Sequence, residues 1–224
     1  MTDAPETAEP SSAPASSSSA SFSSRHRRAL IVLACVAVGA VIVDHLAKMW
    51  AIDTMIERLQ SGEGPMQVIG TWVQFTYTEN TGAAFSIGTG YTWIFSIVAI
   101  IVAIVILRTA RKLGSVGWAI ALGGLLGGLL GNLIDRFTRE PGFGRGYVVD
   151  FIQFPNFPVF NIADSFITCS AVLMVALTLF GIDYRGSAAE ADDESTDESS
   201  APASPSSSSS SSPSSSPSAP GGAE

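Results

Sequence analysis

Residues 116–134 read Val-Gly-Trp-Ala-Ile-Ala-Leu-Gly-Gly-Leu-Leu-Gly-Gly-Leu-Leu-Gly-Asn-Leu-Ile, and this stretch decides the fold. It is 19 residues long, carries no charge and matches the length of a helix that crosses a bilayer core. Its glycines form two rows with a spacing of four residues, Gly123, Gly127 and Gly131 in one and Gly124 and Gly128 in the other. Glycine lets helices approach closely where lipid supplies no hydrophobic drive for association. The stretch therefore predicts a transmembrane helix packed tightly against its neighbours.

Three further apolar runs, at about residues 29–50, 91–107 and 161–182, are also long enough to span a bilayer. The first follows the basic flank Arg25-His26-Arg27-Arg28, as in a signal peptide. No small-residue cleavage site ends this run, so we expect the helix to be retained. The predicted fold class is an all-α integral membrane protein with four transmembrane helices.

The two ends of the chain have a different composition. Residues 1–28 and 186–224 are rich in Ser, Ala and Pro, and we expect two disordered tails around a membrane domain at 29–185. Of the 20 acidic residues, 10 lie in 1–24 and 187–224, so the remainder carries 12 bases and 10 acids, a net charge of +2. The overall charge of −8 therefore comes from the tails. No cluster of Lys and Arg with interleaved aromatic residues suggests a nucleic-acid partner, and we expect none.

Residues 67–78 are rich in β-branched and aromatic residues, with Gly70 interrupting, and predict strand-like structure outside the membrane. Cys35 and Cys169 lie inside apolar runs, where we expect small buried side chains rather than a disulfide or a reactive thiol. The chain has no His/Cys cluster, so we expect neither a metal nor a cofactor.

Basic residues near the helix ends indicate the orientation. Their tight clusters beside the first helix and between the second and third favour a cytoplasmic location for both termini. Seven bases fall on this side, Arg25, Arg27, Arg28, Arg108, Arg111, Lys112 and Arg185, against five on the other, Lys48, Arg58, Arg136, Arg139 and Arg145.

With this topology, polar residues from separate segments meet at the outer membrane boundary. They are Asp44 and Lys48 in the first helix, Asn80 and Gly82 in the loop before the second, Asn132, Asp135 and Arg136 at the end of the third, and Asp150, Asn161 and Asp164 at or before the start of the fourth. The cytoplasmic halves of the helices carry none of these residues. We therefore expect a single site.

Several of these residues also have a purely structural interpretation. Asp44 and Lys48 would neutralise each other and snorkel to the interface, and Asn161 would only cap the fourth helix. Asp135 would form a helix-end ion pair with Arg136. The Asn and Gly of the Asn80 loop would serve only to form a turn. These alternatives stay open at the level of the sequence.

Asp150 and Asp164 are harder to explain structurally, because a carboxylate beside an apolar span is costly without a partner or a function. The sequence shows no nucleophile–His pair at a motif spacing. Two close carboxylates can share a proton, so that the ionised one accepts a proton from water while the protonated one polarises a carbonyl. The positive end of the fourth helix favours charge on Asp164, which leaves Asp150 to carry the proton.

At these residues the chain resembles the lipoprotein signal peptidases, the signal peptidase II family of aspartic membrane proteases. The resemblance covers residues 29–185 and rests on five stretches in the family's order, Asp44-His-Leu-Ala-Lys48, Asn80-Thr-Gly82-Ala-Ala-Phe85-Ser, Gly131-Asn132-Leu-Ile-Asp135-Arg136, Val149-Asp150-Phe151 and Phe160-Asn161-Ile-Ala163-Asp164-Ser165. His45 stands where many relatives have glutamine, and the Ser-rich tails have no counterpart in compact members.

The resemblance implies four helices with a small extracytoplasmic β-structure, Asp150 and Asp164 as the catalytic pair, and no cofactor. It implies that Asp44, Lys48, Asn80, Gly82, Asn132, Arg136 and Asn161 shape the site or bind substrate. The expected reaction is removal of signal peptides from diacylglyceryl-modified prolipoproteins, just before the lipidated cysteine. We expect a monomer in the bacterial plasma membrane that contacts its lipids and acts at the extracytoplasmic face.

Two other functions fit the sequence less well. An ion-coupled transporter needs polar residues at several depths, whereas the inner halves of these helices are mostly Val, Ile, Leu, Ala and Gly. A scaffold whose glycine rows dock partner proteins leaves both aspartates unexplained.

Overall fold

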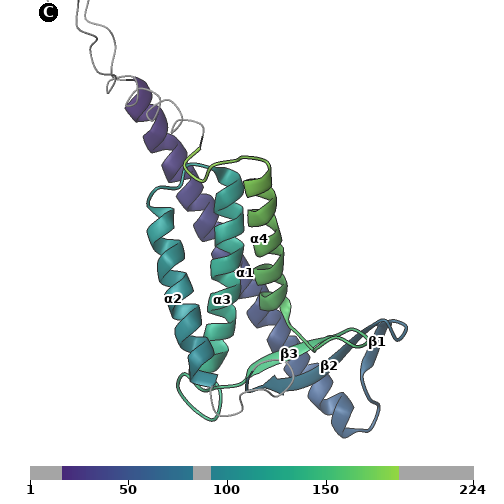
Figure 1. The fold of residues 1–224 in the computed structure, drawn as a ribbon. Coiled ribbons are helices and arrows are strands. Elements are labelled where there is room, and N and C mark those ends of the chain that lie inside the picture. Colours follow the sequence, from purple (N-terminus) through teal and green to yellow (C-terminus); the bar gives the residue numbers. More distant parts are fainter. Residues whose placement is uncertain (1–16, 83–91, 187–224) are drawn as a thin grey trace, which may run out of the picture. The chain divides into compact units, whose positions relative to one another are not determined.

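The computed structural model describes residues 17–82 and 92–186. In these ranges the chain forms four helices and three strands, α1 (Ser17–Gln60), β1 (Met66–Ile69), β2 (Val73–Asn80), α2 (Thr92–Ala110), α3 (Val116–Thr138), β3 (Val148–Gln153) and α4 (Ile162–Leu179) (Figure 1). All four helices are long and apolar enough to cross a membrane. The predicted fold class, with its small β-structure, is therefore confirmed.

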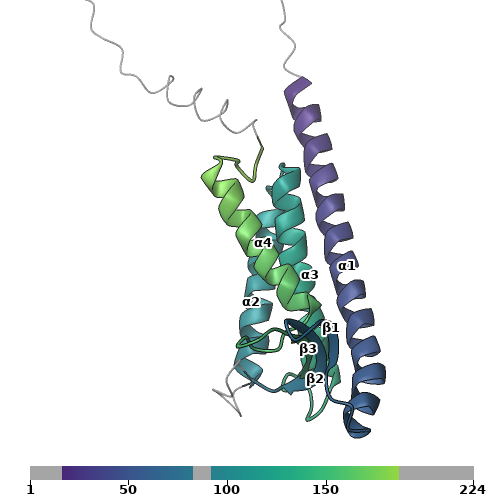
Figure 2. The same cartoon turned by 90° about the vertical axis from the view of Figure 1, so that its right-hand side faces the viewer.

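Helix α3 is the centre of the helical bundle, in contact with α1, α2 and α4 (Figures 1 and 2). Its two glycine rows face different neighbours. A Cβ atom on Gly127 would lie 2.7 Å from the carbonyl oxygen of Ala37 in α1, and one on Gly128 would lie 2.5 Å from the carbonyl oxygen of Ala163 in α4. The absence of side chains thus lets α3 approach two helices at once.

Helix α1 is longer than its apolar run. It begins at Ser17 and continues to Gln60, so the disorder predicted as far as residue 28 is wrong for residues 17–28. The arginines of the basic flank are good helix formers and can extend an existing helix. His26, expected in a disordered flank, instead lies in the helix with Nδ1 2.8 Å from the carbonyl oxygen of Leu113. This contact ties the start of α1 to the segment between α2 and α3.

The strand-like segment folds as two antiparallel strands, β1 and β2, because Gly70 (φ 51°) permits a turn between them. A third strand, β3, pairs antiparallel with β2 and places Thr78 opposite Asp150. The sequence predicted no strand here, only that Asp150 lies before the start of the fourth helix. The first four residues of β3, Val148 to Phe151, are all buried, so both faces of the strand are covered. Its sequence therefore lacks the alternation of polar and apolar residues that marks a half-exposed strand.

An aromatic cluster attaches the sheet to α1. The ring centroid of Trp50 lies 5.3 Å from that of Phe75 in β2 and 6.3 Å from that of Phe151 in β3, both in edge-to-face geometry. Aromatic pairs in this geometry stabilise a fold by more than the burial of their apolar surface alone. The sheet is therefore fixed at one end of the helices, next to the part of α1 that follows Lys48 (Figure 1).

The two cysteines are unpaired but not buried, which corrects the burial expected for them. Cys35 in α1 and Cys169 in α4 both have exposed side chains, and an apolar helix surface of this kind is compatible with contact to lipid. The expectations for residues 1–16, for the part of the Asn80 loop that follows Gly82, and for 187–224 lie outside the described residues.

We predict that Gly127→Ala destabilises the protein by about 1–3 kcal/mol, because the added methyl group overlaps backbone atoms of α1. Gly39→Ala is the matched control, since a Cβ atom there meets nothing within 4 Å. The control should be neutral or slightly stabilising, given the better helix propensity of alanine. Thermal unfolding in detergent micelles measures both, and a Gly127→Ala midpoint at or above wild type would contradict the packing described.

Candidate active site

Lys48 is the buried cation of the site. Its Nζ atom lies 2.7 Å from Asp44 Oδ2 and 2.8 Å from Asp135 Oδ2, and it donates a 3.0 Å hydrogen bond to Asn132 Oδ1. The side chains of Lys48 and Asp44 are each only 1% exposed, so the alternative in which this pair snorkels to the interface is wrong. The ammonium group instead joins α1 to α3.

Asp135 was grouped with the polar residues of the outer boundary, but no role in the site was predicted for it, although it is central to this network. It pairs with Lys48 and, through Oδ1, with Arg139 Nε at 2.8 Å, rather than with Arg136 as in the alternative interpretation. The other oxygen also accepts a 3.4 Å hydrogen bond from the backbone N–H of Val149 in β3. Its position three residues after Asn132, on the same helix face, was the available signal in the sequence.

Asn161 both caps α4 and bridges the site, so the two interpretations of this residue hold together. Its Oδ1 accepts the backbone N–H of Asp164 at 2.9 Å, while the Asp164 carboxylate accepts the backbone N–H of Asn161, which completes a capping box. The Nδ2 group donates to Asp150 at 2.6 Å and to Asn132 at 3.2 Å. The side chain is fully buried.

Asp164 and Asp150 are bonded to two carboxamides, those of Asn132 and Asn161, which are hydrogen-bonded to each other. Asn132 donates from Nδ2 to Asp164 Oδ1 at 2.8 Å, and Asn161 donates to Asp150. The backbone of Phe160 pairs with Ile152, which holds the residue before Asn161 against β3. Local pairing therefore brings the start of α4 alongside Asp150.

Asp150 is 1% exposed, on a strand outside the membrane-spanning segments. Burial and the nearby charge of Asp164 raise the pKa of Asp150 to about 7, against the lowering effect of hydrogen bonds from Asn80 and Asn161. This carboxyl group therefore changes its protonation state near neutral pH.

Asn80 combines turn chemistry with a contact to the site. Its Oδ1 accepts the backbone N–H of Gly82 at 3.1 Å, while its Nδ2 donates to Asp150 Oδ2 at 2.8 Å. On the far side of the network, Asp44 Oδ1 accepts the backbone N–H of Ala163 at 2.8 Å. The predicted site residues other than Arg136 thus form one continuous set of contacts.

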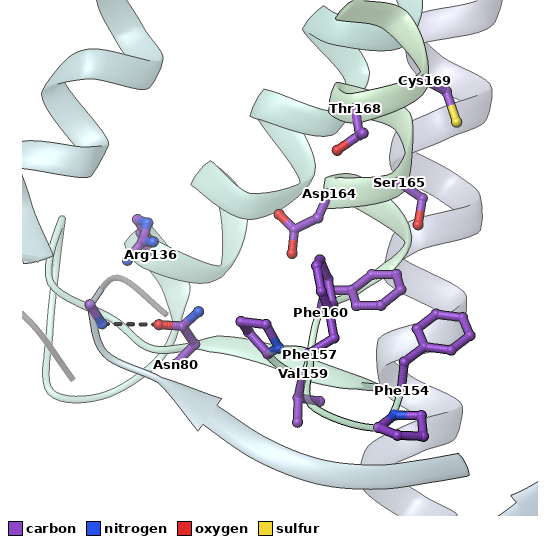
Figure 3. Close-up of a pocket in the computed structure, with 13 residues that line it drawn as sticks. Asn80, Arg136, Phe154, Phe157, Val159, Phe160, Asp164, Ser165, Thr168 and Cys169 are labelled. Atoms are coloured by element: carbon purple, nitrogen blue, oxygen red, sulfur yellow. Dashed lines mark hydrogen bonds between the residues drawn. The ribbon is translucent and has the colours of Figure 1, made fainter. Parts of the chain in front are cut away.

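A cleft of about 840 Å³ opens beside this network (Figure 3). Asp164 lines it from α4, and Asn80 and Arg136 line it from the opposite side. Asp150 does not line the cleft, but it accepts hydrogen bonds from Asn80, which does, and from Asn161. The rest of the wall is largely apolar and comprises Phe154, Pro155, Phe157, Pro158, Val159 and Phe160, with Ser165, Thr168 and Cys169 from α4.

Arg136 brings a positive charge to the cleft. It is 9% exposed, its Nη1 atom has no hydrogen-bond partner within the described ranges, and its charge acts on both Asp150 and Asp164. Its guanidinium carbon lies 5.5 Å from the ring centroid of Phe95. An unpaired buried donor at a cleft is available to a bound ligand.

The aromatic wall and the α4 residues Ser165 and Thr168 were not predicted as site residues. Helical spacing from Asp164 to Thr168 was the available signal in the sequence, because it places both residues on one helix face. Among the described residues, no three His, Cys, Asp or Glu side chains group as metal ligands do.

We predict that Lys48→Met destabilises the protein by about 3–5 kcal/mol, because it leaves the carboxylates of Asp44 and Asp135 buried without a counter-charge. Lys112→Met, at an exposed lysine, is the matched control and should change stability little. Thermal unfolding in micelles is the measurement. Equal midpoints for the two variants would show that Lys48 does not hold α1 to α3.

Residues 36–180 match the sequence model of signal peptidase (SPase) II. The chain is similar to a lipoprotein signal peptidase of Streptomyces griseus, with 43% identity over 163 residues that cover 73% of this chain and 81% of the relative. A lipoprotein signal peptidase of Streptomyces coelicolor is 44% identical over 163 residues, which cover 73% of this chain and 78% of the relative.

The fold is similar to that of a bacterial membrane enzyme solved by the in meso method at 2.3 Å resolution. The TM-score is 0.55 and the identity 30%, over 68% of this chain and 90% of the solved one. A second structure described in the same terms, at 1.9 Å, gives a TM-score of 0.54 and 31% identity over 65% and 90% of the two chains.

A family match over most of the membrane domain, relatives with more than 40% identity and a shared fold all agree with the resemblance noted in the sequence. The chain belongs to the signal peptidase II family of aspartic membrane proteases.

Proposed function

We propose that this protein removes signal peptides from diacylglyceryl-modified prolipoproteins, cleaving just before the lipidated cysteine. The observation that carries the proposal is that one buried residue, Asn161, donates to both carboxyl groups beside an apolar cleft. Its side-chain Nδ2 donates to Asp150 Oδ1, and its backbone N–H donates to Asp164 Oδ2. A lipid-anchored substrate stays in the bilayer, so its scissile bond must be reached near the ends of the membrane helices. Asp164 is in the first turn of such a helix.

The two carboxyl groups have different environments, which suits an acid and a base. We assign the base to Asp164, whose carboxylate accepts hydrogen bonds from the backbone N–H of Asn161 and from the Asn132 carboxamide at the positive end of α4. Burial and the charge of Asp164 raise the pKa of Asp150 to about 7, which favours a proton on Asp150. The pair then holds one proton between its two members.

In the proposed reaction, Asp164 takes a proton from a water molecule as the water oxygen bonds to the scissile carbonyl carbon. Asp150 gives its proton to the carbonyl oxygen, which yields a neutral gem-diol. Asp164 then returns its proton to the leaving nitrogen while Asp150 takes one from a hydroxyl group, and the C–N bond breaks. The products are a carboxylic acid and an amine, and the pair ends with the one proton it began with.

Asn80 controls access to Asp150 in this scheme. Its carboxamide donates to the Asp150 Oδ2 atom and lines the cleft. When a substrate carbonyl arrives, this hydrogen bond is exchanged for one between Asp150 and the substrate. Arg136, with an unpaired Nη1 atom at the same cleft, supplies a donor for a carbonyl of the bound peptide.

The cleft wall suits a lipidated substrate. Its exposed rim residues Phe154 and Phe157 offer apolar and aromatic surface, on which the glyceryl group and the start of its acyl chains lose contact with water. We further propose that the site lies at the extracytoplasmic face of the bacterial plasma membrane, that both termini are cytoplasmic and that the enzyme works as a monomer.

We predict that Asp150→Asn and Asp164→Asn each lower kcat for a lipidated precursor by at least about 10³-fold, since neither variant can complete the proton transfers. Asp53→Asn, at an exposed aspartate of α1, is the matched control and should keep wild-type activity. Cleavage of a diacylglyceryl precursor in micelles is measured by gel shift. Substantial cleavage by either dyad variant with an unchanged unfolding midpoint would exclude the pair.

We predict that cleavage falls as the pH rises through about 7, because Asp150 then loses the proton that it must donate. The hydrogen bond from Asn80 lowers the pKa of Asp150, so Asn80→Ala should move the alkaline limb of kcat/KM to higher pH. Glu79→Gln, next to Asn80 but exposed, should leave the limb in place. If the alkaline limb of kcat/KM does not move in Asn80→Ala, that limb reflects the titration of a group other than Asp150.

A further inference from the structure

We propose that Gln74 and Gln153 form a subsite for the main chain of the mature segment, meaning the substrate residues that follow the lipidated cysteine. The inference rests on the proposed function and extends it to the part of the substrate released as product. The observation behind it is a second, smaller hollow of about 250 Å³, next to the cleft that Asp164 lines.

The two glutamines lie directly opposite each other in the antiparallel pairing of β2 with β3. Residues paired in this way project from the same face of a sheet. Both side chains are half-buried and both line the small hollow, together with Thr71 and Asn156. The polar groups of the hollow thus come from two paired strands, from the turn between β1 and β2 (Thr71) and from the turn after β3 (Asn156).

The hollow shares part of its wall with the cleft. Phe154, Pro155 and Phe157 line both spaces. A hydrogen bond of 3.3 Å from the Phe157 N–H to the Phe154 carbonyl closes the turn that carries them. A peptide whose scissile bond lies at Asp164 can therefore leave the cleft over this aromatic rim and meet the two glutamines.

The chemistry of the hollow suits peptide main chain. A carboxamide donates and accepts hydrogen bonds as a peptide group does, and it carries no charge. In the part of the chain that the structure describes, the side chains of Gln74 and Gln153 have no hydrogen-bond partner, so their donors and acceptors are available. Recognition of the main chain alone is compatible with mature segments of differing sequence.

The test uses lipidated precursors with a common signal peptide and mature segments that end one, three or six residues after the cleavage point. For the wild-type protein we expect kcat/KM to rise about three- to tenfold from the shortest to the longest, as one or two hydrogen bonds are added. In Gln74→Ala/Gln153→Ala this rise should disappear, while cleavage of the shortest precursor stays at the wild-type rate.

Gln67→Ala is the matched control. Gln67 pairs with Gln74 in the register of β1 and β2, on the same face of the sheet, but does not line the hollow. This variant should keep the wild-type dependence on length. Unfolding midpoints of all three proteins are compared first.

A second arm changes the substrate instead of the enzyme. N-methylation of the second and third mature residues removes main-chain donors and should cancel the advantage of the long precursor for wild type, with no further loss in Gln74→Ala/Gln153→Ala. A length dependence that survives in the double variant, or is absent from wild type, overturns the subsite. Failure of wild type to cleave any of the precursors would instead contradict the proposed function.

Discussion

The carboxamide of Asn161 is the contact on which the rest of the site depends. Its oxygen caps α4 through the Asp164 N–H, and its nitrogen reaches Asp150 in β3 and Asn132 in α3. One buried side chain thus fixes where a membrane helix begins, how the sheet meets that helix and where two carboxyl groups lie. A serine could keep the cap but could not span these partners, because it has neither the second polar group nor the reach.

Close packing makes this contact possible. Gly128 lets α3 approach the backbone of Ala163, and Gly127 lets it approach α1, so Asn132 reaches Asp164 at one end of the bundle. The same closeness buries Lys48 between Asp44 and Asp135, where each charge is compensated. Buried ions are costly without partners, and their removal one at a time is more disruptive than their presence. The stability of the helix bundle and the geometry of the proposed site therefore depend on the same close approach of α3 to α1 and α4.

Much of this arrangement could be predicted from the sequence. Span length fixed the four helices, the glycine spacing indicated the packing of α3, and the positions of Asp44, Asn132 and Asp164 near helix ends indicated a single site. Strand β3 and the pairing of Asp135 with Lys48 could not be predicted. Each depends on a partner distant in the chain, and the local pattern carries no signal for it. The cleft was missed for the same reason, because its walls come from separate segments.

We propose that Asp150 carries the proton of the catalytic pair at neutral pH. Isotope-edited infrared spectroscopy of the protein in micelles tests it directly, since a protonated carboxyl group has a C=O stretch distinct from that of a carboxylate. We predict such a band on the acid side of about pH 7, which is lost on the alkaline side and is absent from Asp150→Asn. A band that persists unchanged in Asp150→Asn, or a wild-type spectrum without one at acid pH, would contradict the account.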